Sequence, residues 1–134
     1  MFRIDGLVVL MALGLVLLAC ARSERPRADI TPEHRNAIER VLSARRLPSP
    51  PDSLEVNDSG YLVATYELRA PPDGSIRSHG EDLVIAIREA MRPFNLVHAY
   101  RVTLNGPSPG TGLIKRYGSA RLLEGGSVEW EAAR

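Results

Sequence analysis

Residues 54–68 read LEVNDSGYLVATYEL, and this stretch decides the fold. Its two ends, Leu54–Val56 and Tyr61–Leu68, are rich in aliphatic, β-branched and aromatic residues that favour strands. The segment between them reads NDSG, which is typical of a tight turn. Along the second run, residues 62, 64, 66 and 68 share one face, because successive side chains of a strand point to opposite sides. The sequence therefore predicts a β-hairpin with one buried face.

A helix is predicted on each side of this hairpin. Before it, Thr31–Glu33 supplies an N-cap, a first-turn proline and an acid at the positive helix end, and apolar residues at helical spacing continue to about Arg46. After it, Ser78 and Glu81 have capping-box spacing, and the helix that they open must stop near Pro93. The second helix carries more apolar side chains, so we expect it to be the more deeply buried.

Three further strands are predicted, over residues 97–104, 113–123 and 127–131, with glycine-rich turns between them. The element order is α-β-β-α-β-β-β. Runs joined by short turns favour an antiparallel sheet, here of about five strands, with both helices on one face. The sequence therefore predicts one α+β domain.

One part of this layout resembles a known domain. Residues 58–62, DSGYL, are similar to the glycine-centred hairpin of BON domains. The order α-β-β-α-β also resembles that of BON domains and of ring-building modules in secretion systems. The resemblance covers about half of the chain, and the strands after Asn105 depart from it. It implies attachment to membranes or assembly with partners, although fold alone does not fix function.

Composition sets outer limits on the function. The chain has 134 residues, of which 44% are hydrophobic and 25% charged, and one cysteine. These values suit a single small domain and exclude a large multidomain enzyme, a long solenoid and a disulfide-stapled scaffold. With 17 basic and 16 acidic residues the formal net charge is +1. This balance gives no electrostatic reason to expect nucleic-acid binding.

The N-terminus has the form of a secretory signal. Arg3 precedes an uncharged run, Leu7–Leu18, that is shorter than the roughly 20 apolar residues of a membrane span. The run ends in Leu17-Leu18-Ala19-Cys20, which resembles the lipobox of bacterial lipoproteins. The resemblance implies cleavage between Ala19 and Cys20 and acylation of the Cys20 thiol and of the new amine. An uncleaved membrane anchor, with Cys20 an incidental thiol, is the alternative.

The expected division is a signal peptide over 1–19, a lipidated cysteine and flexible tether over 20–30, and a single domain over 31–134. Residues 21–29, ARSERPRAD, are polar and lack apolar periodicity, as expected for the tether. Ala21 follows the cysteine, where in the lipoprotein family an aspartate retains the protein in the inner membrane. The resemblance therefore implies the periplasmic face of the outer membrane and the membrane itself as a partner.

A search for catalytic chemistry finds little. His34, His79 and His98 have no metal-ligand spacing with one another or with a cysteine, so surface or capping roles are expected. No GxSxG elbow and no phosphate-binding loop is present in the sequence. We therefore expect a protein that is not an enzyme, with no cofactor and no metal. A hydrolase, or an accessory subunit of one, is a less favoured alternative.

Two features keep binding in view. Basic residues lie on adjacent predicted strands, with Tyr100 nearby. The lone Trp130 near the C-terminus is interpreted as core. Lys115, Tyr117 and Arg121 are expected to share one face of their strand. The sequence thus predicts a non-enzymatic envelope protein that binds or scaffolds an envelope partner. The alternative is a lipid-, glycan- or peptide-binding module that uses a basic and aromatic sheet face. The predicted face comprises Arg101, Lys115, Arg116, Tyr117 and Arg121.

Overall fold

The computed structural model describes residues 29–48, 50–70, 74–108 and 110–133. Two helices and five strands follow one another in the predicted order. They are α2 (Pro32–Ala44), β1 (Ser53–Val56), β2 (Tyr61–Glu67), α3 (Ile76–Met91), the 3-10 turn η1 (Arg92–Phe94), β3 (Ala99–Pro107), β4 (Ile114–Leu122) and β5 (Val128–Ala132). The predicted α+β class is confirmed. The predicted signal peptide, Ala19, Cys20 and most of the tether lie outside the described residues.

The five strands form one sheet in the order β1-β2-β3-β4-β5. Three neighbouring pairs are antiparallel, but β2 and β3 run parallel, so the expectation of a wholly antiparallel sheet is wrong at this pair. The cause is α3. This helix carries the chain from the end of β2 back to the level where β2 began, so β3 must run in the same direction. Such a crossover needs a long connection, which the 16-residue α3 supplies.

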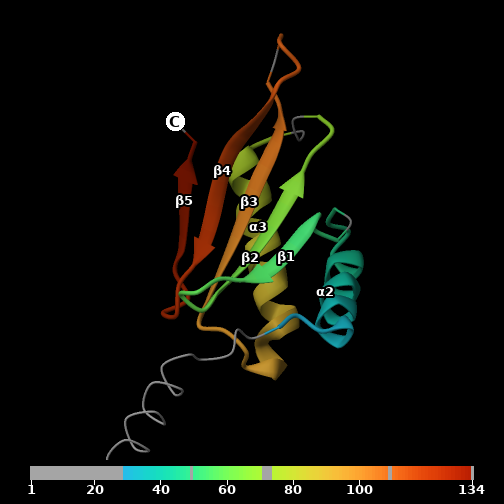
Figure 1. Cartoon of the computed structure of the whole chain (residues 1–134), viewed down its shortest axis with the longest axis vertical. Coiled ribbons are helices and arrows are strands. Elements are labelled where there is room, and N and C mark those ends of the chain that lie inside the picture. Colours follow the sequence, from blue (N-terminus) through green and yellow to red (C-terminus); the bar gives the residue numbers. More distant parts are fainter. Residues whose placement is uncertain (1–28, 49, 71–73, 109, 134) are drawn as a thin grey trace, which may run out of the picture.

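Both helices lie on one side of the sheet, as Figure 1 shows, with α3 behind the strands and α2 beside it. The helix α3 is the more deeply buried, as predicted. Arg45, the C-cap residue of α2, donates a hydrogen bond to Glu89 on α3. The central strands contribute the facing apolar side chains. The fully buried large side chains are Ile38, Leu42, Leu62, Leu83, Val84, Ile87, Met91, Val102 and Leu104.

The helix starts differ in how well the sequence located them. For α2 the N-cap is Thr31, as predicted, and the box is closed by His34: the Thr31 N–H donates to His34 Nδ1 at 3.0 Å, and the His34 N–H donates to Thr31 Oγ1. For α3 the N-cap is Ser75, whose Oγ accepts from the Ser78 N–H. The predicted cap at Ser78 is wrong, because Ser75 meets the same requirement three residues earlier.

Candidate binding face

The helices leave one side of the sheet uncovered, and we call this side the open face. Side-chain alternation and the strand register place every second residue of each strand on it. Three of the resulting cross-strand rows hold its charged, serine and threonine residues. The rows are Glu55-Val63-Arg101-Arg121-Glu129, then Ser53-Thr65-Thr103-Ser119-Glu131, and then Glu67-Asn105-Arg116.

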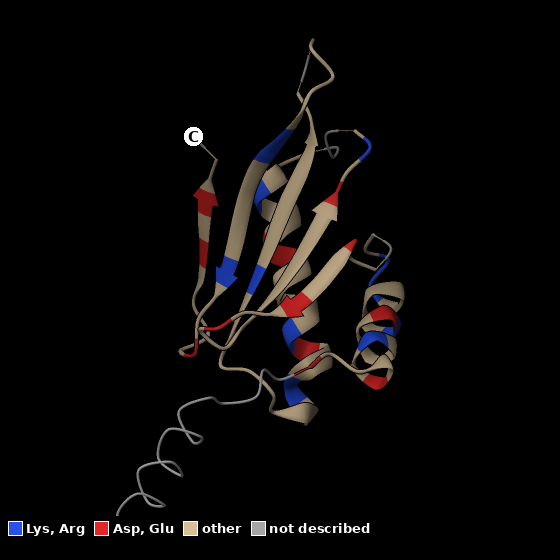
Figure 2. Cartoon of the chain, in the orientation of Figure 1, with Lys and Arg blue, Asp and Glu red and all other residues tan. Residues whose placement is uncertain are grey.

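Charges on the open face are arranged in stripes. The cations lie on the central strands β3 and β4, whereas acidic residues lie on β5 to one side and on β1 and β2 to the other (Figure 2). On β5 the acidic residues Glu129 and Glu131 are both exposed. The face is therefore more mixed in charge than the predicted basic surface.

The centre of the open face holds two arginines directly opposite each other, Arg101 on β3 and Arg121 on β4. Directly opposed side chains have Cβ atoms about 5 Å apart, and like charges in such a pair destabilise a sheet. Arg121 donates to Glu129 at 3.2 Å. Among the described residues Arg101 has no carboxylate partner, and its guanidinium lies 6.0 Å from the centre of the Tyr61 ring. Only one of the two guanidinium groups therefore has a carboxylate partner among the described residues.

The same two arginines carry buried hydrogen-bond donors. Nε of Arg101 and Nε of Arg121 are inaccessible to solvent and have no acceptor among the described residues. A buried donor without an acceptor costs about 1–3 kcal/mol. The like charges and the unpaired buried Nε donors of this arginine pair therefore both destabilise the fold.

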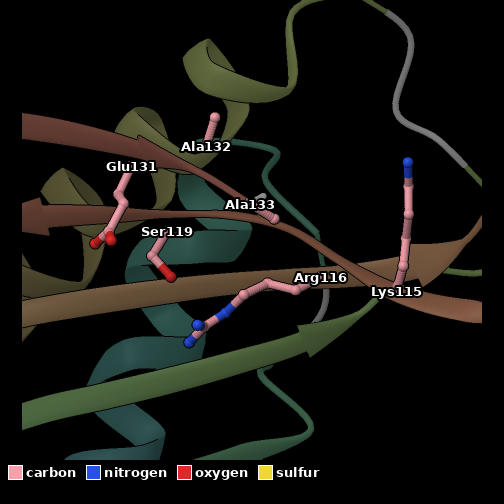
Figure 3. A pocket seen from close by; sticks show the side chains of 6 residues that line it. All are labelled: Lys115, Arg116, Ser119, Glu131, Ala132 and Ala133. Atoms are coloured by element: carbon pink, nitrogen blue, oxygen red, sulfur yellow. The ribbon is translucent and has the colours of Figure 1, made fainter.

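The row next to the two arginines contains a buried polar pair. Thr103 and Ser119 are opposite each other, both are buried, and their hydroxyl oxygens lie 3.1 Å apart in a hydrogen bond. Beside this pair a hollow of about 430 Å³ opens at the far end of β4 and β5. Figure 3 shows Arg116 extending toward Ser119 there, while Lys115 points away from both. The hollow is lined by Lys115, Arg116, Ser119, Glu131, Ala132 and Ala133.

One part of the predicted face is wrong. A β-bulge shifts the register between Leu104 and Asn105, so Gly118 is opposite Leu104 while Arg116 is opposite Asn105. The extra residue is Tyr117, which packs over Gly106 on the helix side and donates from its hydroxyl to the Pro107 carbonyl at 2.6 Å. Tyr117 therefore does not share a face with Arg121.

Lys115, like Tyr117, does not lie on the open face. Its ammonium lies 5.9 Å from the centre of the Tyr117 ring, and its register partner is Gly106 rather than a residue of the open face. Tyr100 is also absent from the open face, because it is buried opposite Leu122, where burial raises its pKa and Arg88 partly opposes that shift. Of the predicted residues, the open face brings together Arg101, Arg116 and Arg121.

Two further residues that were singled out in the sequence can be placed in the structure. His34 is a capping residue, as expected, and its ring meets Phe94 edge-on at 4.5 Å. Trp130 is partly buried against the core. Within the described ranges no three His, Cys, Asp or Glu side chains gather as a metal site. None of the helices described is both long and apolar enough to cross a membrane.

Sequence reasoning missed two features of this region. The direct opposition of Arg101 and Arg121 depends on strand register, which the spacing of residues does not give. The ring of Tyr61 under Arg101 depends on the parallel pairing of β2 with β3. In comparisons with known proteins, no family model, no curated protein and no solved structure matches this chain.

Proposed function

We propose that this protein is a lipid-anchored protein of the bacterial envelope whose folded domain binds a partner through the open face of its sheet. The anchor rests on the sequence of residues 1–20, in which an apolar run leads into Leu-Leu-Ala-Cys. The binding role rests on the domain. Its partner is an envelope protein or peptide, and the domain holds that partner close to the membrane.

The observation that carries the binding role is the pairing of Arg101 with Arg121. A sheet face that served only to meet water would be more stable with opposite charges at these positions. Only Arg121 of this opposed pair has a carboxylate partner among the described residues, so the guanidinium of Arg101 is free to bind an acceptor from outside. Arg116, which lacks an ion pair among the described residues, adds a second free cation at the hollow.

The outer glutamates define what such a partner looks like. Glu55 and Glu67 lie on one side of the arginine stripe, and Glu129 and Glu131 lie on the other. A simple polyanion would meet these carboxylates as well as the arginines, so its affinity would be low. A protein surface or peptide with an acidic centre and basic flanks fits the stripes. We therefore favour a protein partner over a glycan or a free lipid.

A photo-crosslinking experiment in living cells tests this face. A crosslinking side chain is placed at Asn105 on the open face and, as the matched control, at Glu39 on the exposed side of α2. We expect a discrete adduct from position 105 and none from position 39. Introducing Arg116→Glu into the position-105 variant should remove the adduct without lowering stability, because Arg116 is exposed and unpaired among the described residues.

Two results would count against the proposal. Equal adducts from both positions would mean that the open face is not special. An adduct that survives both Arg116→Glu and Arg121→Glu would remove the arginine stripe as the binding site. The anchor is tested separately, by the intact mass and membrane partitioning of the native chain beside Cys20→Ser.

A further inference from the structure

The hairpin formed by β3 and β4 extends past the rest of the sheet as a narrow arm, which Figure 1 shows at the top of the molecule. Its tip is held by backbone hydrogen bonds: the Ser108 N–H donates to the Leu113 carbonyl at 2.7 Å, and the Gly112 N–H donates to the Ser108 carbonyl at 3.1 Å. Pro107 is opposite Ile114 at the last paired position. The arm is thus a defined structure that no other strand covers.

The tip presents two large aliphatic side chains to solvent. Leu113 is 71% exposed and Ile114 is 66% exposed, while the only other exposed large hydrophobic among the described residues, Ile85, is 39% exposed. Neither tip residue takes part in the core. Polar residues would form this turn equally well. Folding therefore does not explain why leucine and isoleucine stand here.

A basic residue comes directly after these two residues in the sequence. Lys115 is exposed, has no carboxylate partner among the described residues, and keeps its ammonium near the Tyr117 ring. Lys115 is one of the residues that line the hollow, but Figure 3 shows its side chain pointing away from Ser119 and Glu131. Leu113, Ile114 and Lys115 form a small amphipathic unit, which we call the arm tip.

We propose that the arm tip inserts into the surface of an anionic lipid bilayer. Aliphatic side chains beside a cation match acyl chains beneath a layer of negative headgroups. A protein partner is less well matched, since a stable protein interface needs roughly 800 Å² on each side and two side chains supply far less. A contact of this size is effective when the chain is already held at the membrane, where its effective concentration is high.

The dimensions of the domain and of the tether allow the lipid anchor and the arm tip to contact the same membrane. β3 has nine residues and so spans roughly 30 Å, and an extended tether from Cys20 to Asp29 also reaches roughly 30 Å. The described chain begins at the end of the molecule opposite the arm tip (Figure 1). In this respect the inference rests on the proposed function: the domain of an anchored chain would lie along the bilayer, with its open face accessible from the side.

Lipid-depth quenching of a tryptophan tests the contact. The full-length chain carrying Leu113→Trp is reconstituted into phosphatidylcholine vesicles with brominated acyl chains, either alone or mixed with phosphatidylglycerol. The emission of Trp130, measured on the parent chain, is subtracted. We expect quenching of at least about twofold at position 113 in the anionic vesicles, and little quenching in phosphatidylcholine alone. Adding Lys115→Glu should restore the emission.

The matched control is Glu67→Trp, at the exposed end of β2 beside the base of the arm. Equal quenching at 67 and 113 would overturn the proposal, because the tip would then have no special contact with lipid. Vesicle flotation separates this result from the anchor. A chain that floats with an unquenched tip refutes the inference and leaves the anchor intact. Flotation only with anionic vesicles, together with a quenched tip, refutes the anchor and supports the inference.

Discussion

At the scale of single residues, two glycines leave the space that the ring of Trp130, the only tryptophan of the sequence, occupies. A Cβ at Gly80 on α3 would lie 2.7 Å from Trp130, and a Cβ at Gly118 on β4 would lie 2.4 Å from it. We predict that Gly80→Ala lowers the free energy of unfolding by about 1–2 kcal/mol, because the overpacking exceeds the gain in helix propensity. Urea unfolding measures this. The smaller side chain in Gly80→Ala/Trp130→Leu should recover part of the loss; a double variant whose losses simply add would contradict the contact.

A second residue-scale prediction concerns Tyr66, whose hydroxyl is buried without a hydrogen-bond partner among the described residues. Burial raises the pKa of Tyr66 well above its usual range, and Asp52 adds to the shift. A raised pKa in the folded state means that the neutral phenol stabilises the fold below about pH 10, and that this stabilisation is lost as pH rises further. Tyr66→Phe should therefore leave stability at pH 7 unchanged or raise it by about 1 kcal/mol.

The dependence of stability on alkaline pH tests whether ionisation of Tyr66 is coupled to unfolding. Between about pH 9 and 11 the native chain should lose stability more steeply than Tyr66→Phe. Tyr100 also has a pKa raised by burial, so the variant should keep part of the slope. Urea midpoints measured across this range would test it. Identical slopes for the two proteins would show that ionisation of Tyr66 is not coupled to unfolding.

At the scale of elements, the opposed arginines link stability to binding. Arg101→Thr removes the like-charge pair and the buried Nε while keeping a residue suited to a strand. We predict that it raises the free energy of unfolding by about 0.2–1 kcal/mol at low salt, with a smaller gain at high salt, where repulsion is screened. The same variant should weaken the adduct from position 105. Thr65→Val, in the neighbouring row of the open face, is the control that changes the side chain without changing charge.

Element scale is also where sequence reasoning reached its limit. Capping located the start of α2, apolar periodicity located both helices, and the NDSG turn with its alternation located the first hairpin, because these signals act between residues close in the chain. The parallel pairing of β2 with β3 is set by the crossover of α3, which no strand pattern records. The bulge beside Leu104 reversed the expected face of Tyr117, because alternation presumes an unbroken strand.

The same distinction explains the candidate site. Basic residues on adjacent strands could be identified from the sequence, and three of them do lie on the open face. Their direct opposition, and the buried Nε of Arg101 and Arg121, follow from register and packing across strands that are distant in sequence. The exposure of Leu113 and Ile114 follows from the length of the arm beyond its neighbours.

At the scale of the whole molecule, anchoring and folding should be separable. The helices, the strands and the buried core described above all lie after Asp29, and the proposed lipid is attached at Cys20. We predict that Cys20→Ser moves the chain from the membrane fraction and abolishes the gain in lipid mass. The free energy of unfolding of the domain, measured in the same detergent, should change by less than about 0.5 kcal/mol, as for sites that share no partners. A large loss of stability would mean that the N-terminal segment takes part in the fold. Unchanged partitioning and an uncleaved mass would instead favour an anchor made by the apolar run of residues 7–18, and inner-membrane partners would then be the ones to test at the open face.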